Sequence, residues 1–91
     1  MKTFVVECYW PGLSEEQARD ILARIGRVAG EASPREKAWP LGCILVPSDG
    51  MALYFLAAPS EAIVRRIGSL AEAPFDRIVE AVHIGFHHQR N

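Results

Sequence analysis

The chain ends in HIGFHHQRN, and His83, His87 and His88 are its only histidines. Imidazole binds transition metals and exchanges protons near neutral pH, so this cluster raises the question of a metal or acid/base site. On a helix, histidines four residues apart bind one ion because a single turn brings them together. On a strand the same spacing separates them by roughly 13 Å, too far for one ion. The chemistry therefore depends on the element that carries this segment.

The first half of the sequence predicts a strand followed by a helix. Residues 2–9 are rich in β-branched and aromatic side chains, and Pro11-Gly12 ends this strand. Ser14 and Gln17 have the spacing of a capping box, so a helix should begin here. Its apolar residues recur at helical spacing, and Gly30 is the expected stop. Residues 31–37 are polar and should form a loop.

The second half predicts a hairpin, a helix and a final strand. Residues 39–46 and 51–58 flank residues 47–50, whose sequence PSDG is typical of a turn. A second helix should open at residues 58–61, with Pro59 in its first turn. Residues 77–86 form the last strand, so His83 and His87 should not bind one ion. Residues 87–91, including His88, are expected to be a frayed tail.

The element order β-α-β-β-α-β predicts one α+β domain over residues 1–91. Two βαβ halves with right-handed crossovers give a ferredoxin-like sandwich with the sheet order 4-1-3-2. Both helices then cover the same face of the antiparallel sheet. The other face has no partner within the chain.

Alternation along each strand assigns side chains to the two faces. The face under the helices is expected to hold Phe4, Val6, Cys8, Gly42, Ile44, Val46, Met51, Leu53, Phe55, Ile78, Val82, Ile84 and Phe86. Glu80 is the exception, and it should lie at an edge or a bulge. The opposite face is expected to carry Thr3, Val5, Glu7, Tyr9, Trp39, Leu41, Cys43, Leu45, Ala52, Tyr54, Leu56, Val79, Ala81, His83, Gly85 and His87.

The second face is therefore nearly as apolar as the first. Apolar patches of more than a few hundred Å² usually mark an interface. We expect a homodimer formed through this face, a dimeric α/β-barrel-like assembly. The alternative is a strand over residues 39–46 that slips by one residue and reverses its two faces.

His83 is the candidate at the centre of this face. Ala81 and Gly85 leave room beside it, and Glu7 is expected one strand away on the same face. His83 and Glu7 are the predicted metal ligands, in a pocket formed by Tyr9, Trp39, Cys43 and Tyr54. Such a pocket binds a metal, holds a small ligand or does acid/base chemistry. Alternatively, a hydrogen bond between His83 and Glu7 only satisfies two buried polar groups.

Composition excludes several classes of partner. The formal net charge is −1, with 49% apolar and 23% charged residues, and the basic residues form no run. This predicts a globular protein without general affinity for nucleic acid or anionic membranes. Neither a signal peptide nor a membrane span is expected. Cys8 and Cys43 are predicted on opposite faces and unpaired, which suits the cytoplasm.

Four segments resemble a small bacterial family with a ferredoxin-like fold, which is represented by a nickel-binding protein. They are Val6-Glu7 with residues 11–17, Trp39, residues 58–63 and residues 74–80. The resemblance implies a dimer and favours a transition-metal site. The chain departs from the family pattern at Leu41-Gly42-Cys43 and at Tyr54, on the face where a ligand is expected. No set of metal ligands is carried over.

These observations favour a binding protein over an enzyme. The first hypothesis is a homodimer that holds a small ligand or a divalent transition metal, such as nickel, between its sheets. The alternative is a cofactor-independent enzyme of the dimeric α/β-barrel type, a monooxygenase or isomerase with His83 as base. A third is a structural or regulatory dimer without a ligand.

Overall fold

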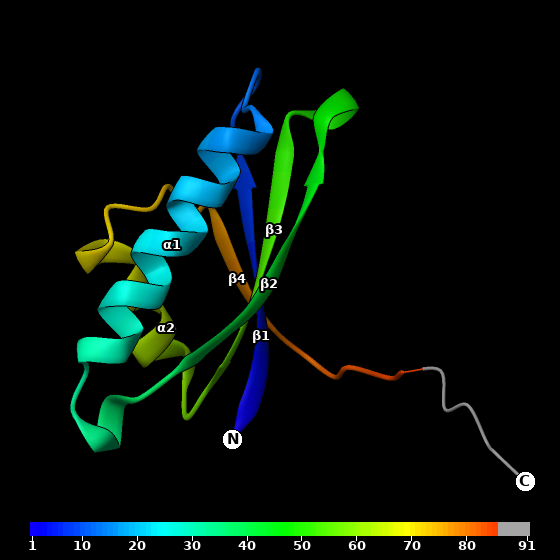
Figure 1. Cartoon of the computed structure of the whole chain (residues 1–91). Coiled ribbons are helices and arrows are strands. Elements are labelled where there is room, and N and C mark those ends of the chain that lie inside the picture. The colour runs from blue at the N-terminus through cyan, green and yellow to red at the C-terminus, as the bar shows by residue number, and fades with distance from the viewer. Residues whose placement is uncertain (86–91) are drawn as a thin grey trace, which may run out of the picture.

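Four antiparallel strands form a sheet that carries both helices on one side (Figure 1). The computed structural model describes residues 1–85. The strands are β1 (Lys2–Tyr9), β2 (Trp39–Val46), β3 (Met51–Ala58) and β4 (Arg77–Ala81), in the order β2-β3-β1-β4. The helices are α1 (Glu15–Glu31) and α2 (Glu61–Leu70), and two short 3-10 turns are η1 (Pro34–Glu36) and η2 (Pro47–Asp49). This is the predicted topology, an α+β sandwich of the ferredoxin-like type.

Side-chain caps fix where the helices begin. The Ser14 hydroxyl accepts from the Gln17 amide at 3.1 Å, and the Gln17 side chain accepts from the Ser14 amide at 2.9 Å. The predicted capping box is therefore confirmed. Ser60 caps α2 by accepting from the Ile63 amide. The expected stop at Gly30 is wrong, because α1 continues to Glu31 and is capped at Ala32.

The core lies between the helices and one face of the sheet. Each helix buries an apolar stripe, and β1 and β3 bury every second residue. The core side chains are Phe4, Val6, Cys8, Leu13, Ala18, Ile21, Ile25, Ala29, Ala38, Ala52, Tyr54, Leu56, Ala58, Val64, Ile67 and Ala71. Phe4, Val6 and Cys8 were predicted here, and Ile78 packs against them in a half-buried position. Neither helix of the described part is long and apolar enough to cross a membrane.

The two faces of the hairpin are the reverse of the prediction. The pairs within the hairpin are as expected, with Ile44 opposite Leu53. However, β3 pairs with β1 so that Tyr54 lies opposite Val6. The helix side therefore receives Cys43, Leu45, Ala52, Tyr54 and Leu56, and the helix-free side receives Gly42, Ile44, Val46, Met51, Leu53 and Phe55.

Tyr54 shows why this arrangement is stable. Every residue of β3 is apolar or aromatic, so alternation alone does not say which face is covered. The Tyr54 hydroxyl donates to the carbonyl of Ala18 on α1 at 3.4 Å. Its ring also lies 6.2 Å from the ring of Phe75, measured between centroids. A large side chain with a polar tip can meet both partners only under the helices.

A bulge in β2 separates its two ends. The pairing with β3 skips one residue between Pro40 and Gly42, so Leu41 is the extra residue. Trp39 pairs with Ala57 and lies on the helix-free side, as predicted, whereas Pro40 turns toward the helices. The bulge leaves Leu41 on the surface, where the residue is 59% exposed.

The last strand is shorter than predicted. The final pair between β1 and β4 joins Thr3 to Ala81, and β1 begins at Lys2. The chain beyond Ala81 therefore has almost no β1 left to pair with. Val82 and Ile84, expected in the core, are 82% and 88% exposed. Phe86, His87, His88 and the tail over residues 87–91 lie outside the described residues.

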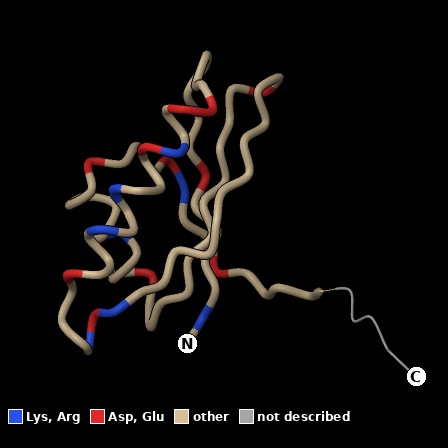
Figure 2. Tube along the Cα trace, in the orientation of Figure 1, with Lys and Arg blue, Asp and Glu red and all other residues tan. Residues whose placement is uncertain are grey.

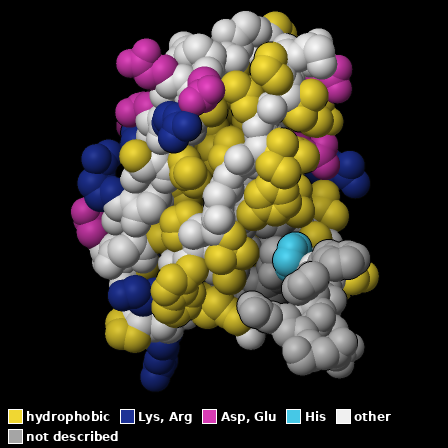
Figure 3. Space-filling model, turned by 45° about the vertical axis from the view of Figure 1, so that its right-hand side comes forward, with side chains coloured by type: hydrophobic (Ala, Val, Ile, Leu, Met, Phe, Trp, Pro, Cys, Tyr) yellow, Lys and Arg dark blue, Asp and Glu magenta, His cyan; other side chains and the backbone are white. Residues whose placement is uncertain are grey.

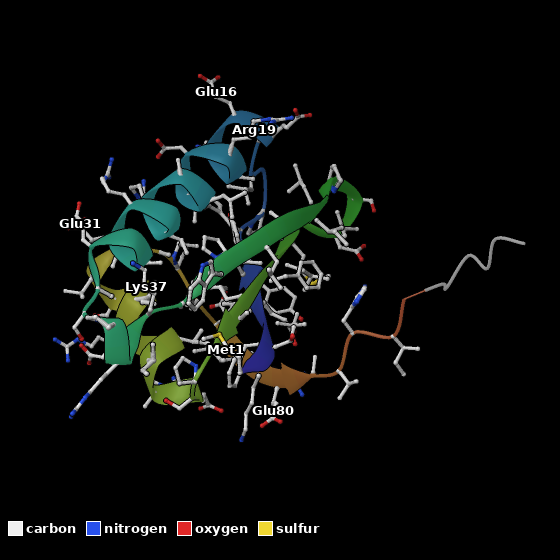
Figure 4. All side chains as sticks on the ribbon, turned by 60° about the horizontal axis from the view of Figure 1, so that its bottom comes forward. Met1, Glu16, Arg19, Glu31, Lys37 and Glu80 are labelled. Carbon is white, nitrogen blue, oxygen red and sulfur yellow. The ribbon has the colours of Figure 1, made fainter. Side chains whose placement is uncertain are left out.

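Charged residues gather on the helical layer and its loops, whereas most of the hairpin carries none (Figure 2). Glu16, Arg19 and Glu31 project from α1 into solvent (Figure 4). Arg24 instead joins the two helices, because its guanidinium donates to the carbonyls of Ala71 at 3.0 Å and Glu72 at 3.2 Å. Glu80 lies on β4, an edge strand, which agrees with its predicted place at an edge or a bulge, and it pairs with Lys2 at 3.4 Å.

Candidate binding site on the open sheet face

The helix-free side of the sheet is the open face, and it is mainly apolar. Its side chains are Thr3, Val5, Glu7 and Tyr9 from β1; Trp39, Gly42, Ile44 and Val46 from β2; Met51, Leu53, Phe55 and Ala57 from β3; and Arg77, Val79 and Ala81 from β4. Figure 3 shows hydrophobic side chains gathered on this side of the molecule. Ile44 is 52% exposed and Trp39 is 48% exposed. The predicted apolar surface therefore exists, but with a different set of hairpin residues.

The two charged residues of the open face pair with each other. A guanidinium nitrogen of Arg77 donates to one carboxylate oxygen of Glu7 at 3.2 Å, and the Tyr9 hydroxyl donates to the other at 2.7 Å. The Glu7 side chain is only 15% exposed. Asp76 supports the cluster by accepting from the Tyr9 amide at 2.6 Å. The polar groups at this end of the face thus satisfy one another.

The Tyr9 phenol is held in its protonated form. Its hydrogen bond to the Glu7 carboxylate, and then the charge of that carboxylate, raise the pKa of Tyr9 above its ordinary value. Tyr9 therefore acts as a hydrogen-bond donor that holds the Glu7 carboxylate in place. Because the two side chains are bonded to each other, neither is free to bind a ligand. The sequence had assigned these two residues to the site around His83.

A hollow of about 470 Å³ lies toward the other end of the face. It is lined by Thr3, Leu41, Gly42, Cys43, Ile44, Phe55 and His83. Most of these residues are apolar, and the hydroxyl of Thr3 and the imidazole of His83 are the polar groups that a ligand would meet. A mainly apolar wall with a few polar groups is typical of small-molecule sites. Trp39 lies in the same cross-strand row as Thr3, because it pairs with Ala57 and Ala57 pairs with Thr3.

His83 and Glu7 do not come together, which corrects the predicted metal pair. Glu7 lies opposite Arg77, while Thr3 lies opposite Ala81, so His83 extends beyond the far end of β1. Four residues of strand separate Glu7 from Thr3 by about 13 Å. One ion cannot contact both side chains of a single chain. Among residues 1–85, no three His, Cys, Asp or Glu side chains are grouped as metal ligands.

Cys43 and Tyr54 do not form the predicted pocket around His83. Tyr54 is fully buried under α1, and Cys43 contributes to the wall of the hollow. Burial raises the pKa of the Cys43 thiol, which opposes formation of a thiolate ligand. Cys8 and Cys43 are both free, as predicted. They lie on the same face, not on opposite faces, with β3 between them.

These buried groups predict a loss of stability in alkali. Burial is the largest cause that raises the pKa of Cys8, Cys43 and Tyr54 above 9.0, 9.0 and 10.0. The folded state therefore favours the neutral forms, so their contribution is complete below those values and is lost as pH rises through them. We expect the free energy of unfolding to fall from about pH 9 upward. Urea titrations should show a shallower fall above pH 10 in Tyr54→Phe, and an equal slope would contradict this role.

A larger hollow of about 620 Å³ runs along α1 beside Trp10. Four charged side chains line it, and all of them except Glu16 are already paired: Arg24 with Asp20 at 2.7 Å, and Arg19 with Glu15 at 2.9 Å. A ligand would have to displace these pairs, whereas the apolar hollow on the open face offers unpaired surface. The open face is therefore the better candidate.

Comparison with known proteins supports the fold and leaves the chemistry open. The chain matches no family model and no curated protein. It is similar to SCO4226 of Streptomyces coelicolor A3(2), a protein with a crystal structure, at a TM-score of 0.78 and 18% identity. The likeness covers 91% of this chain and 99% of that one. The two chains share a fold. At this identity the likeness carries no further conclusion.

Arg77, Phe55 and Ile44 are the residues of the site that the sequence interpretation missed. The sequence did contain a signal for Arg77. An antiparallel strand that begins at residue 77 places its first side chains beside the end of β1, where Glu7 lies. Phe55 and Ile44 had none, because the apolar hairpin gave no basis for choosing its outer face.

Proposed function

We propose that this protein is a homodimeric binding protein whose two open faces enclose a chamber for a small, mainly apolar ligand. His83 supplies a polar group at the wall of that chamber. The observation that carries the proposal is the apolar open face, with the hollow beside His83 opening on it. Two free cysteines suit a reducing compartment such as the cytoplasm.

The composition of the open face supports burial against a second copy. Covering about 500 Å² of apolar surface contributes on the order of 12 kcal/mol before the costs of association. Unpaired charges would oppose burial, but the two on this face, Glu7 and Arg77, already form an ion pair. A two-fold axis would bring the same patch of each copy together.

The lining of the hollow supports a ligand with an apolar body. Leu41, Ile44 and Phe55 offer hydrophobic contacts, and none of the lining residues that the structure describes carries a carboxylate. The enzyme with His83 as base therefore receives no second acid/base group from this wall. A narrower form of the proposal is that the chamber binds a divalent transition metal such as nickel. Since one described chain offers it only His83, its other ligands would come from the second protomer.

Indole is a suitable probe because its flat apolar ring matches the wall and its N–H can bond to an imidazole. We expect saturable chemical-shift changes at Thr3, Phe55 and His83 in untagged protein, and binding at least tenfold weaker in Phe55→Ala. Leu70→Ala, on the outside of α2, is the matched control and should bind as the wild type does. If indole gives no saturable shifts at millimolar concentration, the ligand chamber is wrong.

Calorimetry with Ni²⁺ tests the narrower form on the same untagged protein. A bridging site predicts one ion per dimer, lost in His83→Ala and retained when His87 and His88 are both replaced by alanine. Binding that survives His83→Ala but disappears in the double variant would assign the metal to the tail instead. The indole result is independent of this outcome.

A further inference from the structure

We infer that residues 82–85 form an arm that docks on the second protomer, so that each chamber is completed by both copies. This inference rests on the proposed dimer and adds which segment crosses the interface. Its basis is the arrangement of side chains just after β4. The arm is defined as Val82, His83, Ile84 and Gly85.

The arm has no strand of its own chain to pair with. Thr3 lies opposite Ala81, so only Lys2 and Met1 remain beyond the last pair. Figure 1 shows the chain leaving the sheet on the side away from the helices, and Figure 4 shows its side chains standing clear of the body. A second copy stacked on the open face would occupy that side.

Alternation in the arm gives it two different sides. Successive side chains of an extended segment point in opposite directions. His83 lines the hollow of its own chain, whereas Val82 and Ile84, on the other side, are 82% and 88% exposed. Two β-branched apolar residues therefore face away from the chain that carries them. Burying these two side chains requires an apolar surface, and we infer that the second protomer provides it across the interface.

The size of the open face also supports a contribution from the arm to the interface. Three strands of eight residues and one of five, spaced about 4.8 Å apart and rising about 3.3 Å per residue, have a projected area of roughly 460 Å². A stable interface of standard size buries about 800 Å² on each partner. An arm about 13 Å long adds the exposed side chains of Val82 and Ile84 to the surface that the strands supply. Exposed apolar residues at Leu41 and Ile44 offer it a partner surface.

Two substitutions test the arm with little risk to the fold. Ile84→Asp changes an 88% exposed residue, and Leu70→Asp makes the same kind of change at a 62% exposed residue on α2. Sedimentation over a concentration series should show a dimer Kd at least tenfold weaker for Ile84→Asp, and an unchanged Kd for Leu70→Asp. A wild type that stays monomeric would remove the dimer and the arm together.

Isotope-filtered NMR on mixed labelled and unlabelled chains then identifies the partner. We expect contacts from the Val82 and Ile84 methyl groups to protons of the other protomer. A stable dimer in which Ile84→Asp keeps the wild-type Kd, and no contact crosses between chains, would overturn the arm and leave the proposed function standing. A second outcome would also overturn the arm. In it, the wild type binds phosphatidylcholine vesicles, Ile84→Asp abolishes that binding, and the dimer Kd is unchanged, so lipid and not the second protomer contacts the arm.

Discussion

Ile44→Asp should convert the proposed dimer into a monomer. Ile44 lies on the open face, two residues before the end of β2, and it is 52% exposed in the single chain. A two-fold axis would bury two of the new carboxylates, each without a cation to pair with, because Arg77 is already bonded to Glu7. Burying unpaired charge costs several kcal/mol, and about 4 kcal/mol corresponds to a thousandfold weaker Kd. Sedimentation velocity over a concentration series measures this shift.

The same control used for the arm applies here. Leu70→Asp places a carboxylate at an exposed apolar residue on the helical layer, which the proposed interface leaves free. It should sediment as the wild type does. Circular dichroism should show that Ile44→Asp keeps the native helices, because the side chain contributes little to the core. If Ile44→Asp remains a dimer of wild-type affinity, the open face is not the interface.

Local signals were sufficient to predict the order of the elements and where several of them begin. The Ser14–Gln17 capping box and the turn at residues 47–50 act over a few residues, so their residue types alone identify them. The pairing of Ile44 with Leu53 followed from the length of that turn. Antiparallel pairing of strands one and four also placed Glu7 on the open face correctly.

Tertiary pairing decided what the sequence interpretation missed. Residues 51–58 are apolar on both faces, so only contacts from Tyr54 to α1 and Phe75 settle which face is covered. The end of β4 depends on where β1 begins, which no pattern in residues 77–86 records. The proposed His83–Glu7 pair failed for a related reason: both residues were assigned to one face without asking how far apart they lie along it.

Gly68→Ala should destabilise the fold because there is no room for the added methyl group. Gly68 is buried in α2, and a Cβ atom there would lie 2.3 Å from Cδ2 and 2.5 Å from Cε2 of Phe75. The Phe75 ring packs near Tyr54, so its displacement disturbs the core. Overpacking of this kind costs about 3 kcal/mol, and the better helix propensity of alanine offsets about 1 kcal/mol. The net loss of about 2 kcal/mol lowers the melting temperature by roughly 10 °C.

Gly30→Ala is the matched control, because it makes the same change in a helix with open space around the new methyl group. Alanine is the better helix former, so this variant should gain up to about 1 kcal/mol. Urea unfolding of the two variants should therefore give changes of opposite sign. Phe75→Leu provides a second check, since a smaller side chain makes room and should reduce the cost of Gly68→Ala in a double-mutant cycle. A cost that is the same in both backgrounds would show that Phe75 is not the residue that excludes a side chain at position 68.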